Sequence, residues 1–267
     1  MSSSAADIVD ALGRPHRFEH PPARVISLVP SMTETLFAIG AGRALVGITD
    51  FCIFPRDEVD ALPRVGGTKT PRIDQIRELA PELVYVNLEE NLRRHADEIA
   101  EIAPLFATEP KSVAGVARLI RQLGDIHRCQ GEATRWSEAI ERQAAAIGRA
   151  ARFTFACAIW KDPWMWCGGD TYVSDLVVTA GGVNLFGNEM RYPKHGLEET
   201  LALNPDVVFL PDEPFLFTAA DAEGVKAMTG ARVVGPFPGH LFTWHGTRTL
   251  EGLRFLGRTL GTTVAKA

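Results

Sequence analysis

A segment of fourteen residues occurs twice in this chain, and this internal repeat constrains the fold more than any other feature of the sequence. Residues 73–86 align without a gap with residues 197–210, at a constant offset of 124. In each copy a helix-like stretch is followed by a proline, Pro81 or Pro205, and then by an apolar run that is typical of a buried strand. The repeat predicts two similar α/β lobes with mostly parallel sheets flanked by helices, rather than one continuous domain.

The remainder of the chain also alternates strand-like and helix-like segments. Thr33-Glu34 and Gly40 correspond to Ser174-Asp175 and Gly181, which is a second and weaker match between the halves. A helix is expected to begin at Pro30-Ser31, with Ser31 as N-cap and Glu34 completing a capping box. Strands are expected at 25–29, 45–49, 82–86, 153–160, 206–210 and 231–234, and further helices at 113–127, 172–180 and 250–260.

One long amphipathic helix is predicted between the two halves. Residues 131–151 lack proline and are rich in strong helix formers. Their apolar positions recur every three or four residues and form a narrow stripe, whereas a helix inside a core would carry a broader one. We therefore expect a connecting backbone helix at 128–152 between an N-terminal lobe at 1–127 and a C-terminal lobe at 153–267. The alternative is an ordinary amphipathic helix within one domain.

Composition and charge limit the classes of function. The chain has 267 residues, 46% of them hydrophobic, and a net charge of −5, which argues against a nucleic-acid partner. No apolar run reaches the roughly 20 residues of a membrane-spanning helix. The four cysteines form no CxxC pair, so neither a zinc site nor a disulfide framework is expected, and free thiols suit a reducing compartment. Residues 1–25 lack an export signal, so the chain is expected either to be cytoplasmic or to have lost such a signal.

Aromatic residues gather in loops that follow predicted strands. Loops normally lie on the surface, where exposed rings call for something to cover them. The functional interpretation is a cleft between the lobes for a large, flat, apolar ligand, with polar side chains at its rim. The alternative is that about half of these rings fill the lobe cores. The aromatic residues concerned are Phe51, Phe54, Trp160, Trp164, Trp166, Tyr192, Phe215, Phe217, Phe242 and Trp244.

Two acidic residues occupy equivalent places in the repeat. Asp74 and Glu198 fall in the first turn of a predicted helix in each lobe. A carboxylate there stabilises a helix by about 0.3–1 kcal/mol through the helix dipole, and this alone accounts for both residues. The other interpretation is that they form two matching anchor points for arginines of a partner.

No motif for catalysis or metal binding withstands inspection. Gly40-Ala-Gly42 lies between a helix and a strand, the reverse of the order that phosphate binding requires, and is read as a helix C-cap. His195, His240 and His245 lack metal-ligand spacing. No nucleophile elbow or acid–base pair is present, so no enzyme and no catalytic cofactor are predicted.

Several longer motifs resemble those of one known family. The segments SLVPSMTE, RVGGTKTPRIDQIRELAPELVYV, GGDTYVSDLV and GLEETLALNPDVVFL resemble the cobalamin- and iron-siderophore-binding proteins of ABC importers, also called helical-backbone metal receptors or class III periplasmic binding proteins. The similarity covers about residues 8 to 260. At Ala180 and Gly257, where some members carry a disulfide, this chain has no cysteine. Its details are closest to a branch of the family that lacks an export signal.

This resemblance implies two α/β lobes joined by a backbone helix, with a cobalamin-like corrinoid held between them for ABC-type import. It further implies that Asp74 and Glu198 dock to permease arginines, that the protein is a monomer, and that it is periplasmic if an export signal was removed. The alternatives are a haem or ferric-siderophore ligand, an intracellular corrinoid-handling protein without a permease, and an enzyme. The implied ligand contacts are Phe51, Trp160, Trp164, Trp166, Arg191, Tyr192, Phe215 and Trp244.

Overall fold

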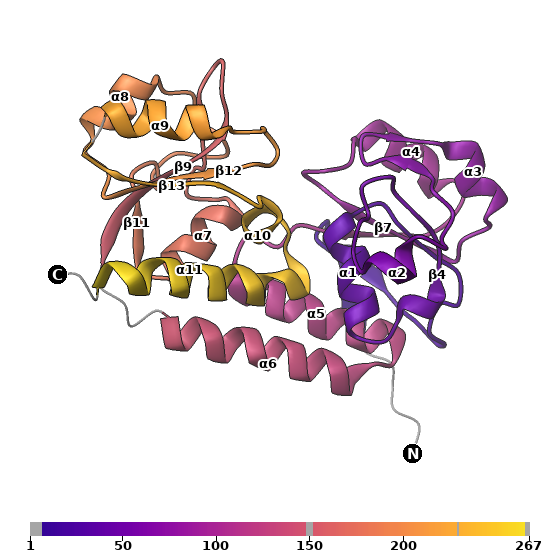
Figure 1. Cartoon of the computed structure of the whole chain (residues 1–267). Helices are drawn as coiled ribbons and strands as arrows, with labels where there is room; N and C mark the ends of the chain where they lie inside the picture. Colours follow the sequence, from indigo (N-terminus) through magenta and orange to yellow (C-terminus); the bar gives the residue numbers. More distant parts are fainter. Residues whose placement is uncertain (1–6, 148–151, 229, 265–267) are drawn as a thin grey trace. The chain divides into compact units, whose positions relative to one another are not determined.

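The computed structural model describes residues 7–147, 152–228 and 230–264, and the chain divides into two compact units. Unit 1 comprises Met1–Pro110 and Ala117–Glu138, and unit 2 comprises Lys111–Val116 and Ala139–Ala267. The boundaries fall inside α5 (Val113–His127) and α6 (Gln130–Ile147), so each of these helices contributes residues to both units. Figure 1 shows helices packed around a central sheet in each unit.

Unit 1 is organised around a parallel sheet. In its described part, four strands lie in the order β4-β3-β7-β8, and every neighbouring pair is parallel. Their side chains are almost all buried because helices cover both faces, as is usual for parallel sheets. The strands are β3 (Val25–Ser27), β4 (Leu45–Ile48), β7 (Leu83–Asn87) and β8 (Leu105–Thr108), and a small hairpin is formed by β5 (Gly66–Gly67) and β6 (Thr70–Pro71).

The helices of unit 1 pack through apolar side chains on the two faces of this sheet. Ile76 of α3 and Ile99 of α4 pack with Ile26, Val84 and Leu105 in one buried cluster. Figure 1 shows α3 and α4 on one side of the sheet and α1 on the other. Their bounds are α1 (Pro30–Ala38), α2 (Arg56–Val59), α3 (Ile73–Glu78) and α4 (Arg93–Ala100), with a 3-10 turn at Gly42–Ala44.

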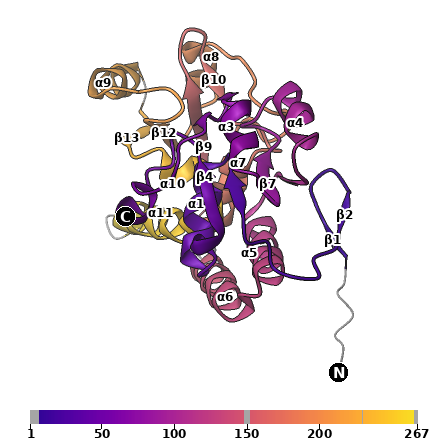
Figure 2. The same cartoon turned by 90° about the vertical axis from the view of Figure 1, so that its right-hand side faces the viewer.

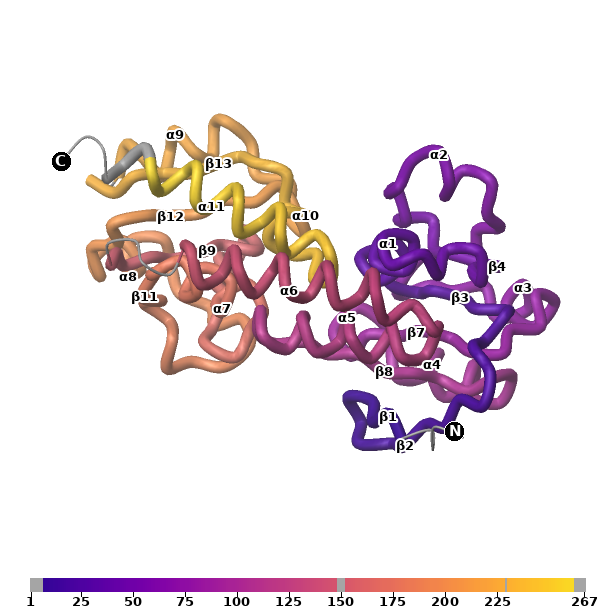
Figure 3. Tube along the Cα trace, turned by 90° about the horizontal axis from the view of Figure 1, so that it is seen from below, coloured from indigo at the N-terminus to yellow at the C-terminus, as the bar shows by residue number. Residues whose placement is uncertain are grey.

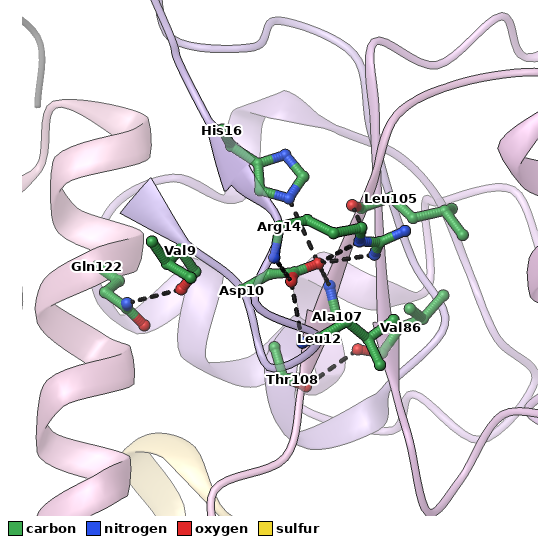
Figure 4. A network of polar contacts seen from close by, with 10 residues as sticks. All are labelled: Val9, Asp10, Leu12, Arg14, His16, Val86, Leu105, Ala107, Thr108 and Gln122. Atoms are coloured by element: carbon green, nitrogen blue, oxygen red, sulfur yellow. Dashed lines mark hydrogen bonds and ion pairs between the residues drawn. The ribbon is translucent and has the colours of Figure 1, made fainter. Parts of the chain in front are cut away.

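A short N-terminal hairpin covers the edge strand of this sheet. β1 (Ile8–Val9) and β2 (Pro15–His16) pair antiparallel on the β7–β8 side of unit 1 (Figure 2), and Ala11 N donates to Ala107 O of β8. The buried Asp10 carboxylate accepts bonds from the backbone and the guanidinium of Arg14 and from Ala107 N (Figure 4). Burial alone would raise the pKa of Asp10, but these donors outweigh it and lower that pKa. The hairpin is therefore anchored through one buried charge.

α6 (Gln130–Ile147) occupies most of the stretch that was predicted to form a connecting helix, and it lies next to α5. Ala133, Ile140 and Ile147 of its predicted stripe are buried, and Trp136 is half-buried with its indole N–H donating to Ala38 O in unit 1. Figure 3 shows α5 and α6 running side by side, and a Cβ at Gly124 of α5 would collide with Ala133 of α6. Residues 148–151, predicted to continue the helix, lie outside the described residues.

Unit 2 is built on a second, mostly parallel sheet. Among its described residues, β9 pairs with β11 and β12, and β12 pairs with β13, all in parallel, while β10 runs antiparallel to β9. Figure 1 shows α8 and α9 on one face of the sheet and α7, α10 and α11 on the other. The strands are β9 (Phe153–Trp160), β10 (Met165–Trp166), β11 (Gly182–Asn184), β12 (Val207–Pro211) and β13 (Arg232–Phe237), and the helices are α7 (Tyr172–Thr179), α8 (Leu197–Ala202), α9 (Ala219–Met228), α10 (His240–Thr243) and α11 (Thr249–Val264), with a 3-10 turn at Gly246–Arg248.

The predicted fold class is confirmed, and one local prediction is wrong. Both units are α/β with mostly parallel sheets, and the two copies of the repeat form α3–β7 and α8–β12. Ser31, however, is not an N-cap: α1 begins at Pro30 after Val29, and no side chain caps it. Proline at the first helical position has its backbone angle set for a helix and needs no partner for a missing N–H, so the helix starts without a capping box.

Candidate functional site

Apolar side chains are exposed where the parallel strands of unit 1 end. Phe51 and Ile53 follow β4, and Leu88 follows β7. Phe51 keeps 59% of its surface exposed, which is unusual for an aromatic ring. Because the carboxyl ends of parallel strands meet at one edge of the sheet, these residues belong to the same edge, which is where open α/β sheets bind ligands. We call this the carboxyl edge of unit 1.

Hydrogen bonds of the neighbouring residues fix the backbone of the loop that carries Phe51. The buried Cys52 thiol lies 3.2 Å from the hydroxyls of both Thr33 and Thr49. The Arg64 guanidinium donates to the carbonyls of Thr49 and Cys52, at 3.0 and 2.8 Å. These contacts fix the backbone on both sides of Phe51, so little backbone entropy would be lost if its exposed ring bound a ligand.

Unit 2 exposes a larger aromatic group at the carboxyl edge of its own sheet. Trp160 ends β9 and is 42% exposed, with its ring 5.3 Å from that of Phe215 in an edge-to-face arrangement. Phe215 follows β12 and contacts Phe217, whose ring is stacked on Trp164 at 5.7 Å. Aromatic pairs at these distances stabilise one another by about 0.5–1.5 kcal/mol beyond area burial, so the rings form one connected cluster.

Trp166 lies behind this cluster. It is fully buried, stacks on Trp164 at 5.5 Å, and donates its indole N–H to His195 O. A ring without exposed surface cannot touch a ligand, so Trp166 supports Trp164 and is not itself a contact residue. The sequence interpretation that some rings fill the core therefore applies to Trp166, Phe217 and Phe242, while Trp160 remains on the surface.

Trp244 is positioned by an acid from the loop that follows β12. It is buried, with 7% of its surface exposed, and its indole N–H donates to Glu213 Oε1 at 3.0 Å. Burial raises the pKa of Glu213, and the neighbouring Asp212 carboxylate adds to that rise, although the bond from Trp244 opposes it. The Asp212 carboxylate in turn accepts the backbone N–H of Gly239, at 2.6 Å. Trp244 therefore offers at most a ring edge to a ligand.

Arg191 and Tyr192 occupy a loop between β11 and α8. Arg191 is exposed and Tyr192 is half-buried, and the guanidinium carbon lies 5.6 Å from the centre of the tyrosine ring. This distance is typical of a cation–π pair. The two side chains therefore pack against each other on this loop.

The two acids of the repeat both occupy the second residue of a short helix. Asp74 in α3 is 92% exposed at its side chain and pairs with Arg77 at 3.0 Å. Glu198 in α8 is exposed as well, while its neighbour Glu199 accepts the backbone N–H of Gly196. Glu199, not Glu198, therefore supplies the cap of α8. Both repeat acids are accessible to a partner.

The histidines that were considered as metal ligands from the sequence do not form a metal site in the described residues. His195 pairs with Glu189 at 2.8 Å and stacks on Phe186, and His245 is buried. Among residues 7–147, 152–228 and 230–264, no group of three or more His, Cys, Asp or Glu side chains is arranged to hold a metal ion. In the same residues, no helix is long and apolar enough to span a membrane.

Ile53, Leu88 and Asp170 belong to these surfaces but were not singled out from the sequence. Ile53 and Leu88 could have been found by asking which apolar residues directly follow a buried run, instead of looking for aromatic rings alone. The part played by Asp170, which accepts the N–H of Arg191, depends on a contact across 21 residues and has no local signal.

Apolar side chains exposed at the carboxyl edge of an α/β sheet, as in both units, lie where proteins of this architecture bind their ligands. The family described as periplasmic binding protein matches residues 25–232, and the chain belongs to this family. Its function is therefore substrate binding for ABC import, and it is not an enzyme. A vitamin B12-binding protein of Vibrio parahaemolyticus is 24% identical over 71% of this chain and 70% of its own length. An ABC transporter substrate-binding lipoprotein of Bacillus subtilis, YvrC, is 24% identical over 95% of this chain and 84% of its own.

Solved structures share the fold. The periplasmic vitamin B12-binding protein BtuF of Vibrio cholerae has a TM-score of 0.78 at 21% identity, covering 91% of this chain and 98% of its own. The haem-binding protein HutB of the same organism has a TM-score of 0.76 at 18% identity, covering 89% and 98%. These relatives are periplasmic proteins or lipoproteins, which does not support the cytoplasmic alternative considered from the sequence.

Proposed function

We propose that this protein binds a cobalamin-like corrinoid and delivers it to an ABC permease. The observation that carries the proposal is the exposure of apolar side chains at the carboxyl edges, above all Phe51 in unit 1 and Trp160 in unit 2. Covering either side chain with a large flat ring would remove apolar surface from water, which contributes about 25 cal/mol per Å². The candidate contacts are Phe51, Trp160, Trp164, Arg191, Tyr192, Phe215 and Trp244, with Trp166 as a support.

A corrinoid suits these surfaces better than an anionic ferric siderophore. Rings and aliphatic side chains are exposed at both edges, whereas a site for a multiply charged anion would be expected to present a cluster of arginines and lysines. The vitamin B12-binding relative of Vibrio parahaemolyticus and the fold shared with BtuF support the same choice.

Haem is the second candidate ligand, and one observation favours it. Met190, which is exposed, and Tyr192, which is half-buried, are residue types that can bind haem iron axially. The fold is also shared with the haem-binding protein HutB. Haem would use the same apolar edges but would require one of these side chains on the metal.

Delivery to a permease is proposed to use Asp74 and Glu198. Their exposure and their equivalent places in α3 and α8 suit two similar contacts with arginines of a partner. Export to the periplasm, or attachment to the membrane as a lipoprotein, follows from the same proposal.

Calorimetric titration of the purified protein with cyanocobalamin, haemin and ferric siderophores of the hydroxamate and catecholate types tests the choice of ligand. We expect cyanocobalamin to bind with a dissociation constant of about 1 μM or lower and the siderophores at least about tenfold more weakly. Tighter binding of haemin, with the absorbance change of axial ligation, would favour the second candidate. Tighter binding of a siderophore would contradict both candidate ligands, the corrinoid and haem.

A further inference from the structure

Two cysteines face each other at the base of the hairpin that β9 and β10 form. In this hairpin Trp166 lies opposite Ala158. Cys167 N donates to Cys157 O at 2.9 Å, which continues the antiparallel pairing by one more residue. The carbonyl of Cys167 is fixed as well, because it accepts a bond from Asn184 Nδ2 at 2.9 Å. Cys157 and Cys167 are therefore opposed residues on neighbouring strands.

The side chains of this pair lie on the same face of the sheet and contact each other. Successive side chains of a strand alternate between the two faces, so Cys157 and Cys167 both point away from the face that Ala158 and Trp166 occupy. Both cysteines are fully buried, and their thiols are hydrogen-bonded to each other. Opposed residues of an antiparallel pair have Cα atoms about 4.5–5.5 Å apart, and a disulfide joins Cα atoms about 4.4–6.8 Å apart. The backbone therefore suits a bond between the two sulfur atoms.

We propose that Cys157 and Cys167 form a disulfide bond when the chain folds in an oxidising compartment. The bond would close the base of the β9–β10 hairpin, on which Trp160 and Trp164 of the aromatic cluster lie. Export to such a compartment is part of the proposed function, on which this inference therefore rests. It departs from the expectation of free thiols drawn from the sequence, where a separation of ten residues gives no sign that two cysteines are opposed.

Burial limits the stage at which this bond can form. The nucleophile in thiol–disulfide exchange is the thiolate. Burial raises the pKa of the Cys157 thiol, and the adjoining Cys167 thiol adds to that rise. Neither residue has exposed surface, so an oxidant cannot reach the sulfur atoms in the folded unit 2. The bond therefore forms before the core of unit 2 is packed, and the same burial then shields it from reductants.

The oxidant is itself a disulfide, either that of a thiol oxidase of the compartment or oxidised glutathione. The thiolate of one cysteine attacks a sulfur atom of the oxidant, which forms a mixed disulfide and releases the other sulfur of the oxidant as a thiolate. The second cysteine loses its proton, attacks the protein sulfur of the mixed disulfide and expels the remaining sulfur of the oxidant. The protein thus loses two electrons and two protons, and the oxidant leaves as two thiols.

Refolding of the full chain from urea in a buffer with oxidised glutathione tests the proposal, and refolding in dithiothreitol is the control. The products are unfolded, alkylated with N-ethylmaleimide and weighed intact. Of the four cysteines, we expect two to be alkylated in the oxidised sample and four in the reduced one. Trypsin cuts after Arg152, Lys161 and Arg191, so peptides 153–161 and 162–191 should remain joined only in the oxidised sample.

Thermal melting and two variants separate this bond from other effects of the oxidant. The oxidised wild type should melt about 5–10 °C above the reduced wild type, because the bond restricts the unfolded chain. Cys167→Ala should melt at the same temperature in both buffers. Cys129→Ala removes a half-buried thiol of unit 1 and should retain both the joined peptides and the difference in melting temperature.

The effect of burial is tested on the folded, reduced wild type. When it is incubated with oxidised glutathione for the time that suffices for oxidative refolding, we expect all four cysteines to remain alkylatable after unfolding. Rapid oxidation under these conditions would overturn the requirement that the bond forms during folding.

The outcomes also distinguish this proposal from the proposed function. Four alkylated cysteines after oxidative refolding, or joined peptides that contain Cys52 or Cys129 instead, would overturn the disulfide. Titration of the same samples with cyanocobalamin and haemin is judged separately. A protein that forms the bond and binds neither ligand would contradict the proposed function alone, and a protein that binds one of them without forming the bond would contradict the disulfide alone.

Discussion

Ala80 and Asn204 adopt the same left-handed backbone conformation at equivalent places in the two units. Their φ angles are 43° and 53°, and each residue lies between the helix of its repeat copy and the proline that leads into the strand, Pro81 or Pro205. A left-handed residue ends a helix by satisfying its last carbonyls. The internal repeat therefore extends from residue types to a specific backbone conformation in two places that are 124 residues apart.

This relationship predicts that Ala80→Gly stabilises unit 1. Alanine in the left-handed region is disfavoured by about 1–2 kcal/mol, of which the greater chain entropy of glycine offsets a part. We expect a gain of roughly 0.5–1 kcal/mol in the free energy of unfolding, and a smaller gain for Asn204→Gly because asparagine tolerates this region. Urea unfolding measures both.

The helical residue Ala100 in α4 provides the matched control. Ala100→Gly should destabilise by about 1 kcal/mol, because glycine is unfavourable where the backbone is α-helical. A loss of stability in Ala80→Gly of the same size would contradict the assigned conformation.

The buried pair of Tyr85 and His127 predicts acid sensitivity in unit 1. The Tyr85 hydroxyl lies 2.8 Å from His127 Nε2, and burial lowers the pKa of His127 to about 4. The unfolded chain protonates near pH 6.5, before the folded chain does. The stability that the neutral imidazole provides is thus complete above pH 6.5 and is lost as the pH falls from 6.5 to 4. The free energy of unfolding should fall by up to about 1.4 kcal/mol per pH unit in this range.

Replacing His127 by glutamine removes this titration. The free energy of unfolding of the wild type should fall by about 2–3 kcal/mol more than that of His127→Gln between pH 7 and pH 4.5. His245 in unit 2, whose pKa burial also lowers to about 4, is common to both proteins and cancels in the difference. Parallel pH profiles for the two proteins would show that His127 titrates normally.

The exposed ring of Phe51 at the carboxyl edge of unit 1 should affect binding and not folding. Phe51→Ala should weaken cyanocobalamin binding by about 1–2 kcal/mol, because the ring's contact with the ligand is lost. Its effect on stability should stay within about 0.5 kcal/mol because the ring is exposed. Trp160→Ala should weaken binding by a similar amount, and it should also lower stability by about 0.5–1.5 kcal/mol because its edge-to-face contact with Phe215 is lost.

Exposed leucines elsewhere serve as controls for these variants. Leu12 lies in the β1–β2 hairpin and Leu203 precedes β12, at the opposite end of that strand from Phe215. Leu12→Ala and Leu203→Ala should leave affinity unchanged. Equal losses of ligand affinity in the controls and in the edge variants would show that the carboxyl edges have no special role in binding.

The acids of the repeat should affect delivery and not ligand affinity. Asp74→Ala and Glu198→Ala are expected to bind ligand as the wild type does, while uptake through the reconstituted permease falls severalfold for each and further for the double variant. Asp97 in α4 and Glu223 in α9 are exposed acids outside the repeat positions and provide charge-matched controls. Weakened ligand binding in Glu198→Ala would show that this residue has been misassigned.

The fold was predictable because its strongest signals are local. The apolar run that became β9 and the helix at 113–127 are found where the pattern predicts them. β10, with two residues, and α10, with four, are too short to show a period and depend on tertiary contacts. At α1 the local signal was misleading instead of absent. The sequence contains a capping motif at Ser31, but the helix starts without using it.

Which aromatic rings remain exposed could not be predicted, because their burial depends on contacts with residues far away in the sequence. Trp164 and Trp166 are two residues apart and look equivalent in the sequence, yet only Trp166 is enclosed by Phe186 and the carbonyl of His195. Those partners come from twenty to twenty-nine residues further along the chain. The pattern identified the right loops, and long-range packing decided which side chains on them remain available.

Whether this protein binds a corrinoid is decided by calorimetric titration of the unmodified protein with cyanocobalamin at two temperatures. We expect one site per chain, a dissociation constant of about 1 μM or lower, and a negative heat-capacity change from the burial of apolar rings. Absence of heat at ligand concentrations of about 100 μM at both temperatures would contradict it.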